Sequence, residues 1–430
     1  MSTRAFGIFL LSLFTALYVY GQDPDMLRAS PDAIAAIEAG KYDEASVAWW
    51  GFNEEDATDA MQAAIDSKVS TLIVPYMGKP WIIRPVKLRS NLELRFEPGV
   101  VVLAKKGEFK GKGDSLFTAV NCENITVSGY GACLRMYKAD YQSDAYEKAE
   151  WRMCLDFVGC SNIRVEGVTL EESGGDGIYL GATDKQPWCA DVIIRDVQCK
   201  NHHRQGISVI SAVNLLIENC TLTGTRGTAP QAGIDLEPNS ENEKMTNVVV
   251  RNCTMADNAG AGILVYLKPM RSTTEAVSIL FENCHVSSGD DQGIAVGAIG
   301  DDGPGGKIEF LNCTVENTKN GGSYIYDKSA TAAEVRFTNC KWSNVAEKKR
   351  GTPILIHLRR ESITKKQGGI VFDDCVIFDQ YDRPVLKTEE SQGEKGATGI
   401  SGRLLRQGPG AARLDITPKN SDCTLDVSSL

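Results

Sequence analysis

The chain has 430 residues, of which 42% are hydrophobic and 41 are Gly, and its formal net charge is −10 at pH 7. This length and apolar content allow a large buried core and more than one domain. The negative charge argues against nucleic acid and anionic membranes as partners, because both would be repelled.

The first 21 residues are predicted to be an export signal. Arg4 precedes an apolar run from Ala5 to Val19, and Gly21 provides a small residue at the cleavage site. The run is too short to span a membrane comfortably, so no membrane insertion is expected; the alternative is a buried N-terminal strand. The mature chain, beginning at Gln22, is predicted to be soluble and exported to the periplasm or the extracellular medium.

Residues 22–70 are interpreted as a lead-in that ends in a capping helix over Thr58–Ser67. The predicted apolar side of this helix comprises Ala60, Ala63, Ala64 and Ile65. The strands that follow are predicted at Thr71–Pro75, Trp81–Ile83 and Leu92–Phe96. A helix in this place would cover the unpaired strand edges at the open end of a β stack.

One short phrase recurs through the middle of the chain, every 27 to 31 residues. Its copies are Gly177-Ile-Tyr-Leu, Gly206-Ile-Ser-Val, Gly233-Ile-Asp-Leu, Gly262-Ile-Leu-Val and Gly293-Ile-Ala-Val. A second phrase alternates with it and ends in Asn-Cys at Cys220, Cys253, Cys284, Cys313 and Cys340. A unit of this length without helical periodicity buries its apolar side only by stacking on its neighbours. The repeat therefore predicts an all-β fold, a parallel β-helix over 71–385, followed by a looser polar C-terminal cap or tail over 386–430.

The Asn and Cys of the second phrase are interpreted as structural. Asn tolerates the left-handed conformation that a sharp turn requires, and stacked Asn side chains can bond to one another. The predicted turn residues are Asn219, Asn252, Asn283, Asn312 and Asn339, with Asp196 and Asp374 in flanking coils. The phrase's Cys residues, together with Cys375, are predicted to form a ladder of buried free thiols, which pack as small hydrophobic groups. Cys133, Cys154 and Cys189 lie outside that ladder and are the candidates for a disulfide in an exported chain.

Candidate chemistry lies on the outward side of the repeated strands. The apolar residues of the first phrase point inward and the intervening ones outward, because strand side chains alternate. Asp235 and Glu237 are therefore predicted to share one outer face, about 7 Å apart. The candidate site residues are Asp176, Tyr179, His202, His203, Arg204, Gln205, Asp235, Glu237 and Tyr266.

Two carboxylates at such a spacing suit general acid and base catalysis of glycoside cleavage. The competing interpretation is a structural cluster in which Arg204 pairs with Asp235. No metal-binding quartet is found, and no cofactor is expected, with Ca²⁺ binding left open. Asp290 and Asp291 are interpreted as a solvated turn or as ligands of that ion.

The chain resembles the right-handed parallel β-helix proteins of the pectate-lyase-like superfamily over residues 55–380. The resemblance rests on the Asn-Cys turns, the Gly-Ile strands and the opening Asp56-Ala-Thr-Asp-Ala-Met-Gln-Ala-Ala-Ile65. It is closest to uncharacterised exported bacterial members with the motifs Gly174-Gly-Asp-Gly-Ile178, Arg204-Gln-Gly-Ile-Ser208 and Gly233-Ile-Asp-Leu-Glu-Pro-Asn239. Polygalacturonases carry an Asp-Asp pair, a Gly-His-Gly turn and an Arg-Ile-Lys run, none of which is present in that form here. This departure argues against polygalacturonase activity itself.

The resemblance and the outward residues together predict an exported enzyme that cleaves a polysaccharide, most simply a glycoside hydrolase. Asp235 would be the principal acid or base and Glu237 or Asp176 its partner. Arg204, His203, His202 and Gln205 would bind substrate, and Tyr179 and Tyr266 would stack on sugar rings. A polysaccharide lyase or uronate epimerase is the alternative, and a non-catalytic glycan-binding or surface protein is the second alternative. The sequence defines no oligomeric state.

Overall fold

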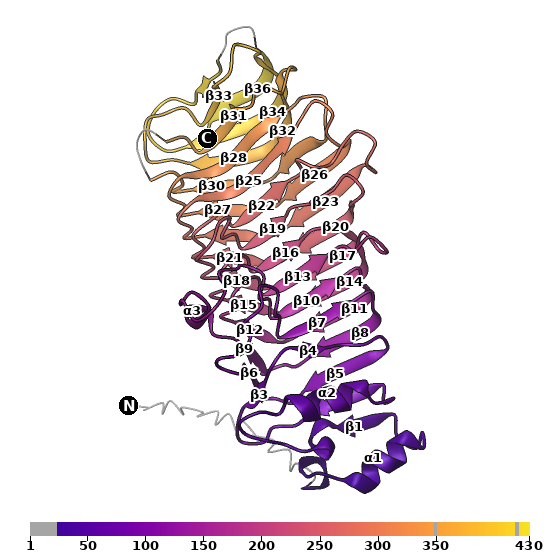
Figure 1. Cartoon of the computed structure of the whole chain (residues 1–430). Coiled ribbons are helices and arrows are strands. Elements are labelled where there is room, and N and C mark those ends of the chain that lie inside the picture. The colour runs from indigo at the N-terminus through magenta and orange to yellow at the C-terminus, as the bar shows by residue number, and fades with distance from the viewer. Residues whose placement is uncertain (1–23, 348–350, 418–420) are drawn as a thin grey trace, which may run out of the picture.

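The computed structural model describes residues 24–347, 351–417 and 421–430, and it shows one elongated stack of β-coils (Figure 1). The chain climbs from helices near its N-terminus to strands at its C-terminus, and nearly every coil adds one parallel strand to each of three faces. The predicted all-β parallel β-helix is confirmed. The predicted export signal at 1–21 lies outside the described residues.

Face 1 is a 12-stranded parallel sheet. Its strands are β4 (Val86–Lys87), β7 (Phe117–Val120), β10 (Leu155–Val158), β13 (Ile178–Gly181), β16 (Ile207–Val209), β19 (Ile234–Leu236), β22 (Ile263–Tyr266), β25 (Gln292–Ile299), β28 (Gly321–Lys328), β31 (Ile354–Leu358), β33 (Leu386–Glu390) and β35 (Leu414–Asp415).

Faces 2 and 3 belong to one 24-stranded sheet and follow face 1 in each coil. Face 2 comprises β1 (Glu44–Ser46), β2 (Thr71–Val74), β5 (Leu92–Phe96), β8 (Glu123–Ser128), β11 (Ser161–Glu166), β14 (Cys189–Arg195), β17 (Ala212–Glu218), β20 (Met245–Arg251), β23 (Val277–Glu282), β26 (Gly306–Leu311), β29 (Glu334–Thr338), β32 (Gln367–Phe378), β34 (Ala397–Gln407) and β36 (Asp422–Ser429). Face 3 comprises β3 (Trp81–Ile83), β6 (Val101–Ala104), β9 (Cys133–Arg135), β12 (Thr169–Glu171), β15 (Gln198–Lys200), β18 (Thr221–Thr223), β21 (Thr254–Ala256), β24 (His285–Ser287), β27 (Thr314–Glu316) and β30 (Lys341–Ser343).

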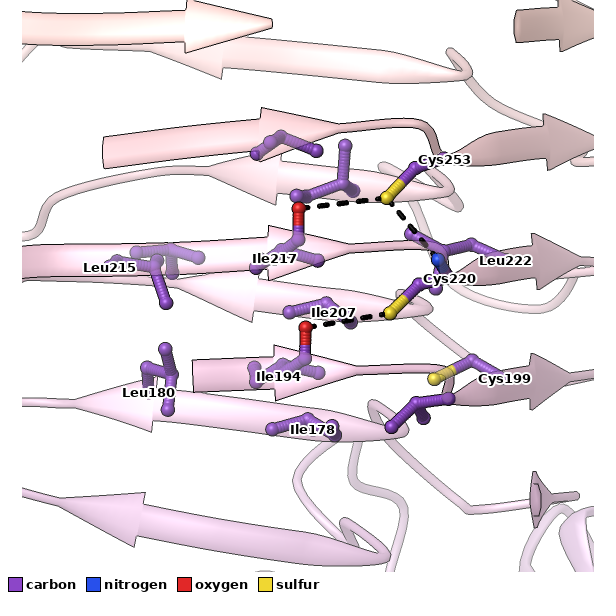
Figure 2. Packing of buried hydrophobic residues seen from close by; sticks show 14 of the residues in the cluster. Ile178, Leu180, Ile194, Cys199, Ile207, Leu215, Ile217, Cys220, Leu222 and Cys253 are labelled. Carbon is purple, nitrogen blue, oxygen red and sulfur yellow. Dashed lines mark hydrogen bonds between the residues drawn. The ribbon is translucent and has the colours of Figure 1, made fainter. Parts of the chain in front are cut away.

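The recurring Gly-Ile phrase owes its composition to the core and to close packing between coils. Ile178, Leu180 and Ile207 point into the interior, where they are fully buried (Figure 2). A Cβ atom on Gly206 would lie 2.4 Å from the carbonyl oxygen of Gly233 in the next coil, closer than any side chain tolerates. The phrase therefore needs Gly at the entry to each face-1 strand and an apolar residue after it.

Helices cover the N-terminal end of the stack, as predicted. They are η1 (Pro24–Leu27), α1 (Pro31–Glu38), η2 (Val47–Trp50) and α2 (Thr58–Asp66). The buried side of α2 consists of Thr58, Met61, Ala64 and Ile65, whereas Ala63 is exposed. The helix is thus rotated from the predicted orientation, because Met61 fills the core position assigned to smaller residues.

The strand stack is longer at both ends than its predicted limits of 71 and 385. At the N-terminal end, β1 pairs in parallel with β2. At the C-terminal end, β34 pairs with β32 and β36 pairs with β34, so part of the predicted looser tail is regular sheet. The strand β34 carries one Gly-Ile pair, Gly399-Ile400, but the irregular Gly spacing around it obscured the repeat in the sequence.

The predicted thiol ladder is present in the core. The Cys220 Sγ lies 3.8 Å from the carbonyl oxygen of Ile194 one coil below, and the Cys253 Sγ lies 3.8 Å from that of Ile217 (Figure 2). All thirteen Cys residues are free. The disulfide candidates Cys133, Cys154 and Cys189 are therefore corrected to free thiols, since no pair of them is bonded.

Ellman titration of the native protein is expected to label at most the three half-buried thiols, those of Cys122, Cys133 and Cys423, because the other ten are buried. All thirteen are expected to react after unfolding in guanidinium without reductant. Fewer than thirteen reactive thiols in the unfolded protein would mean that disulfides form, and would contradict this assignment.

The Asn residues that precede the thiols form the predicted side-chain ladder. The Asn312 amide donates to the Asn283 Oδ1 at 3.2 Å and accepts from the Asn339 amide at 2.7 Å. Asn312 has φ of 54°, in the left-handed region that other side chains avoid. The ladder therefore satisfies both the conformation of the turns and their polar groups.

Asn312→Ala is expected to lower the free energy of unfolding by about 2 kcal/mol, because it removes two amide hydrogen bonds and puts Ala in the left-handed region. Asn312→Gly is expected to recover roughly half of this loss, since Gly accepts the conformation but not the hydrogen bonds. Urea unfolding monitored by circular dichroism measures both. Equal stability of the Ala variant and the parent would contradict the structural role.

Within the described residues, no helix is long and apolar enough to cross a membrane.

Candidate active site

A column of polar side chains follows the outer surface of face 1. The strand register aligns Asp156 of β10 with Tyr179 of β13, then Ser208 of β16, then Asp235 of β19. Ile234 and Leu236, on either side of Asp235, point into the core, so Asp235 itself points outward as predicted. It is nevertheless fully buried, because neighbouring turns and side chains cover it.

Gln205 holds the carboxyl group of Asp235. The Gln205 Nε2–H donates to the Asp235 Oδ2 at 2.7 Å, and the Gln205 Oε1 accepts from the backbone N–H of Ala232 at 2.8 Å. The other carboxyl oxygen of Asp235 is buried and forms no hydrogen bond of regular geometry among the described residues, and the carboxyl group of Glu237 lies close enough to interact with Asp235. Burial and the nearby charge of Glu237 raise the pKa of Asp235 well above its ordinary value. Asp235 is thus a carboxyl group fixed in position and biased toward its protonated form.

Asp176 enters the same cluster from the turn before β13. Its side chain is fully buried, and neither carboxyl oxygen has a partner within the described part of the chain. Burial raises its pKa to about 7, against the opposing charge of Arg204. The buried Ser208 hydroxyl and the backbone N–H of Gln205 lie close enough to favour the ionised form of Asp176, although neither forms a hydrogen bond of regular geometry with it. Unpaired polar atoms of this kind are rare in proteins, and they are typical of a place that receives water or a ligand.

Arg204 lies at the centre of these acids. Its Nη2 is 3.3 Å from the Glu237 Oε2, and its Nε is 3.8 Å from the Glu150 Oε1. Burial alone would lower the pKa of Arg204, but the carboxylates of Asp176, Asp235, Glu237 and Glu150 raise it. Arg204 therefore pairs with Glu237. In the structural cluster considered as the competing interpretation, its partner was Asp235.

Asp156 was missed in the sequence because its strand, Leu155-Asp-Phe-Val, lacks the Gly-Ile phrase. Its Oδ1 is buried and unpaired among the described residues, and the Ser115 hydroxyl lies 3.4 Å from its Oδ2. Burial raises the pKa of Asp156 to about 6. Only its alignment with Asp235 in the coil register reveals it.

His202 and His203 face the protein rather than the outer surface. The His202 ring is fully buried, with Nδ1 2.8 Å from the Ser173 Oγ, and burial lowers its pKa to about 3. The His203 Nε2 lies 2.8 Å from the Thr228 Oγ1. These contacts hold both imidazoles in the turn that carries Arg204 and Gln205, and their role in substrate binding stays a prediction.

The two predicted Tyr platforms lie on either side of Asp235 along the coils. A Cβ atom on Gly181 would lie 2.4 Å from the Tyr179 ring, which therefore lies flat over this Gly. The Tyr266 hydroxyl accepts from the Arg360 Nη2 at 3.4 Å. Both side chains are half-buried, so each leaves part of its ring accessible.

Two cavities open at the C-terminal ends of the face-1 strands. The larger, of about 710 Å³, is lined by Ala182, Thr183, Asp184, Pro187, Trp188, Ser240, Asn242 and Glu243. The smaller, of about 330 Å³, includes Arg360 in its lining. The ring of Tyr179 packs against Gly181, the residue before the lining residue Ala182, and Tyr266 contacts Arg360, which lines the smaller cavity.

Asp290 and Asp291, considered as Ca²⁺ ligands, bind protein groups. Asp290 forms ion pairs with Arg226 and Lys319, and Asp291 accepts a hydrogen bond from the Asn320 amide. Across 24–347, 351–417 and 421–430, no three His, Cys, Asp or Glu side chains gather closely enough to hold a metal ion. The dependence on Ca²⁺ stays a prediction to be tested in solution.

A family model described as "Right handed beta helix region" matches residues 149–277. Among curated proteins, the chain is 29% identical over 186 residues to the uncharacterized protein YclG of Bacillus subtilis. It is 24% identical over 196 residues to the SPbeta prophage-derived uncharacterized protein YorA of the same organism. These matches cover 40% and 42% of this chain but 32% and 33% of the relatives, so the chain spans about a third of their length.

Solved structures share the architecture over most of the chain. An exopolygalacturonase from Thermotoga maritima aligns with a TM-score of 0.62 at 15% identity, covering 86% of this chain and 91% of that one. The catalytic unit of a GH87 alpha-1,3-glucanase from Streptomyces thermodiastaticus aligns with a TM-score of 0.64 at 14% identity, covering 89% of this chain and 67% of that one. The A-module of a mannuronan C-5 epimerase from Azotobacter vinelandii aligns with a TM-score of 0.61 at 13% identity, covering 89% of this chain and 99% of that one. The chain thus has the right-handed parallel β-helix fold, which confirms the predicted resemblance to pectate-lyase-like proteins at the level of the fold.

Proposed function

We propose that the protein is a carbohydrate-active enzyme that hydrolyses a glycosidic bond of a polysaccharide at the carboxyl cluster of face 1. The observation that carries this proposal is the convergence of buried, unpaired carboxyl oxygens from Asp156, Asp176 and Asp235 on one outer surface. A purely structural cluster would pair these oxygens. A hydrolase, by contrast, needs a carboxylic acid that keeps its proton near neutral pH beside an ionised carboxylate.

In the proposed reaction Asp235 donates its proton to the glycosidic oxygen. Glu237, paired with Arg204 as a carboxylate, accepts a proton from the attacking water. Gln205 keeps the Asp235 carboxyl in place, and the negative charge of Glu237 opposes ionisation of Asp235, to which Asp176 adds once pH exceeds its own pKa of about 7. Tyr179 and Tyr266 would contact sugar rings on the two sides of the bond that breaks.

The structural neighbours support a carbohydrate substrate. They include an exopolygalacturonase, an alpha-1,3-glucanase, a mannuronan epimerase and a bacteriophage tailspike in complex with a pentasaccharide. With identities of 13–15%, they suggest the substrate class but not the reaction. We also propose that the protein acts after export, and N-terminal sequencing of the protein recovered outside the cytoplasm would test this by showing Gln22 first.

The test is incubation of the purified protein with a panel of neutral and acidic polysaccharides, with and without Ca²⁺. Reducing ends and ultraviolet absorbance are followed together. New reducing ends without absorbance would support hydrolysis. Saturable binding without turnover on any polysaccharide would overturn the proposed hydrolysis and favour a glycan-binding protein. In such a protein the Gln205–Asp235 and Arg204–Glu237 contacts would be structural.

A lyase or uronate epimerase is the second candidate, and the position of Arg204 among the acids is the observation that favours it. A cation beside a base is what removal of a proton α to a uronate carboxylate requires. A rise in absorbance together with reducing ends would identify a lyase. A change of uronate configuration without chain cleavage would identify an epimerase.

A further inference from the structure

The larger face-1 cavity arises from the lengths of three consecutive turns. The turn from β16 to β17 has two residues, Ile210 and Ser211. The turns on either side are longer, with seven residues at 182–188 and eight at 237–244. The two long turns stand above the short one, and their residues line a cavity of about 710 Å³. This volume is within the range of pockets that hold small ligands.

We propose that this cavity is a subsite for an uncharged pyranose ring of the polysaccharide, next to the bond that is cleaved. The inference rests on the proposed function: the lining residue Ala182 directly follows Gly181, against which the ring of Tyr179 packs. It extends that function by naming the kind of sugar unit that the enzyme accepts on this side.

Trp188 provides the apolar surface that a sugar ring needs. Its indole lines the cavity together with Pro187. Lys244 stacks on the indole at 4.3 Å from its centroid and is itself paired with Glu275 at 2.8 Å. Lys244 is not part of the cavity lining, and it can cover only one of the two faces of the indole. The C–H faces of pyranose rings pack well on such aromatic surfaces.

Glu243 provides the polar counterpart. Its side chain is 5% exposed, and its Oε2 accepts from the backbone N–H of Ser240 at 3.0 Å and from that of Asn239. No described residue forms a hydrogen bond with its Oε1. One oxygen therefore fixes the carboxyl group in place, and the other is available to accept from the hydroxyl groups of a sugar, a strong type of hydrogen bond.

The charges of the cavity select against acidic sugars. Asp184 and Glu243 are its only ionisable lining residues, and no Lys or Arg joins them. A uronate carboxylate or a sulfate placed here would meet two acids, and the ammonium group beside Trp188, that of Lys244, is already paired with Glu275. An uncharged hexose or pentose ring meets no such penalty.

The experiment measures binding separately from turnover, by isothermal calorimetry in the Asp235→Asn background. The probes are hexasaccharides of glucose, galactose, mannose and xylose, compared with oligogalacturonate and oligomannuronate. At least one neutral probe is expected to bind tenfold or more tightly than either acidic one. Trp188→Ala is expected to weaken this binding tenfold or more, whereas Trp151→Ala, a control at a 46% exposed Trp outside the cavity, is expected to leave it unchanged.

Glu243→Gln keeps an oxygen for the backbone N–H groups and removes the charge, so it is expected to narrow the preference for neutral over acidic probes. The subsite is overturned if no neutral probe binds, if acidic probes bind as tightly, or if the Trp188 variant matches the Trp151 control. These outcomes are distinct from failure of the proposed function. Neutral-sugar binding without turnover by the parent would support the subsite and contradict hydrolysis. Hydrolysis that is unaffected by Trp188→Ala would support the proposed function and contradict the subsite.

Discussion

Asp235→Asn is expected to lower kcat by about 10²–10⁴-fold, the usual contribution of a general acid. The amide is isosteric with the carboxyl group and can still accept from the Gln205 Nε2–H through its oxygen, so the fold is expected to persist. It cannot give a proton to a leaving oxygen. The measurement is steady-state hydrolysis of whichever polysaccharide the panel identifies, with circular dichroism to confirm the β-helix.

Asp382→Asn is the matched control, because Asp382 is 62% exposed and lies far along the chain from the site, paired with Arg413. It is expected to leave kcat unchanged. Activity of the parent is expected to fall as pH rises through the pKa of the acid, and the direction of that pKa shift places the fall above the range of an ordinary Asp. Retention of full activity by the Asp235 variant would remove Asp235 from the reaction.

Asp176→Asn is expected to stabilise the protein at pH 8. The pKa of Asp176 is about 7 in the folded state and about 3.9 when unfolded. Because the folded pKa is raised, the folded state holds the proton more tightly between these values. The stability that this provides is complete below about pH 4 and is lost as pH rises through 7. A rise of three pKa units corresponds to on the order of 4 kcal/mol of unfolding free energy. The attraction of Arg204 for ionised Asp176 is already included in this shift and makes it smaller than burial alone would.

The measurement is urea unfolding of parent and variant at pH 4 and pH 8. The variant is expected to be more stable than the parent at pH 8 and to lose that advantage at pH 4, where the parent keeps its proton. Asp382→Asn again serves as the exposed control and is expected to show no such pH-dependent gain. A variant less stable than the parent at pH 8 would show that Asp176 is a structural ion-pair partner of Arg204.

The sequence alone predicted the solenoid well, because its period, its inward residues and its turns are all local patterns. A Gly at the repeat position of Gly206 indicates close packing between coils, and an Asn at that of Asn312 indicates a left-handed turn. The same reasoning placed Asp235 on the outer surface, since alternation along a strand needs no knowledge of the neighbours.

What the sequence could not give was the environment of each outward side chain. Asp156 escaped notice because its strand has no Gly, and Glu243 because it lies in a turn. His202 and His203 were expected to bind substrate, but a turn can aim a side chain inward or outward, and only tertiary contacts decide which. The buried state of Asp235 and Asp176, on which the proposed chemistry depends, likewise comes from turns contributed by other coils.

The short turn at Ile210 and Ser211 has a consequence for how such proteins diversify. Turn residues lie outside the repeating strands, so a turn can gain or lose residues while the stacked core keeps its register. A few residues inserted at 210–211 would fill the space between its two longer neighbours without altering the carboxyl groups beside it. Under the proposed function, a lineage of β-helix proteins can therefore change the sugar that it accepts through a single insertion or deletion, and inherit the proposed catalytic groups unchanged.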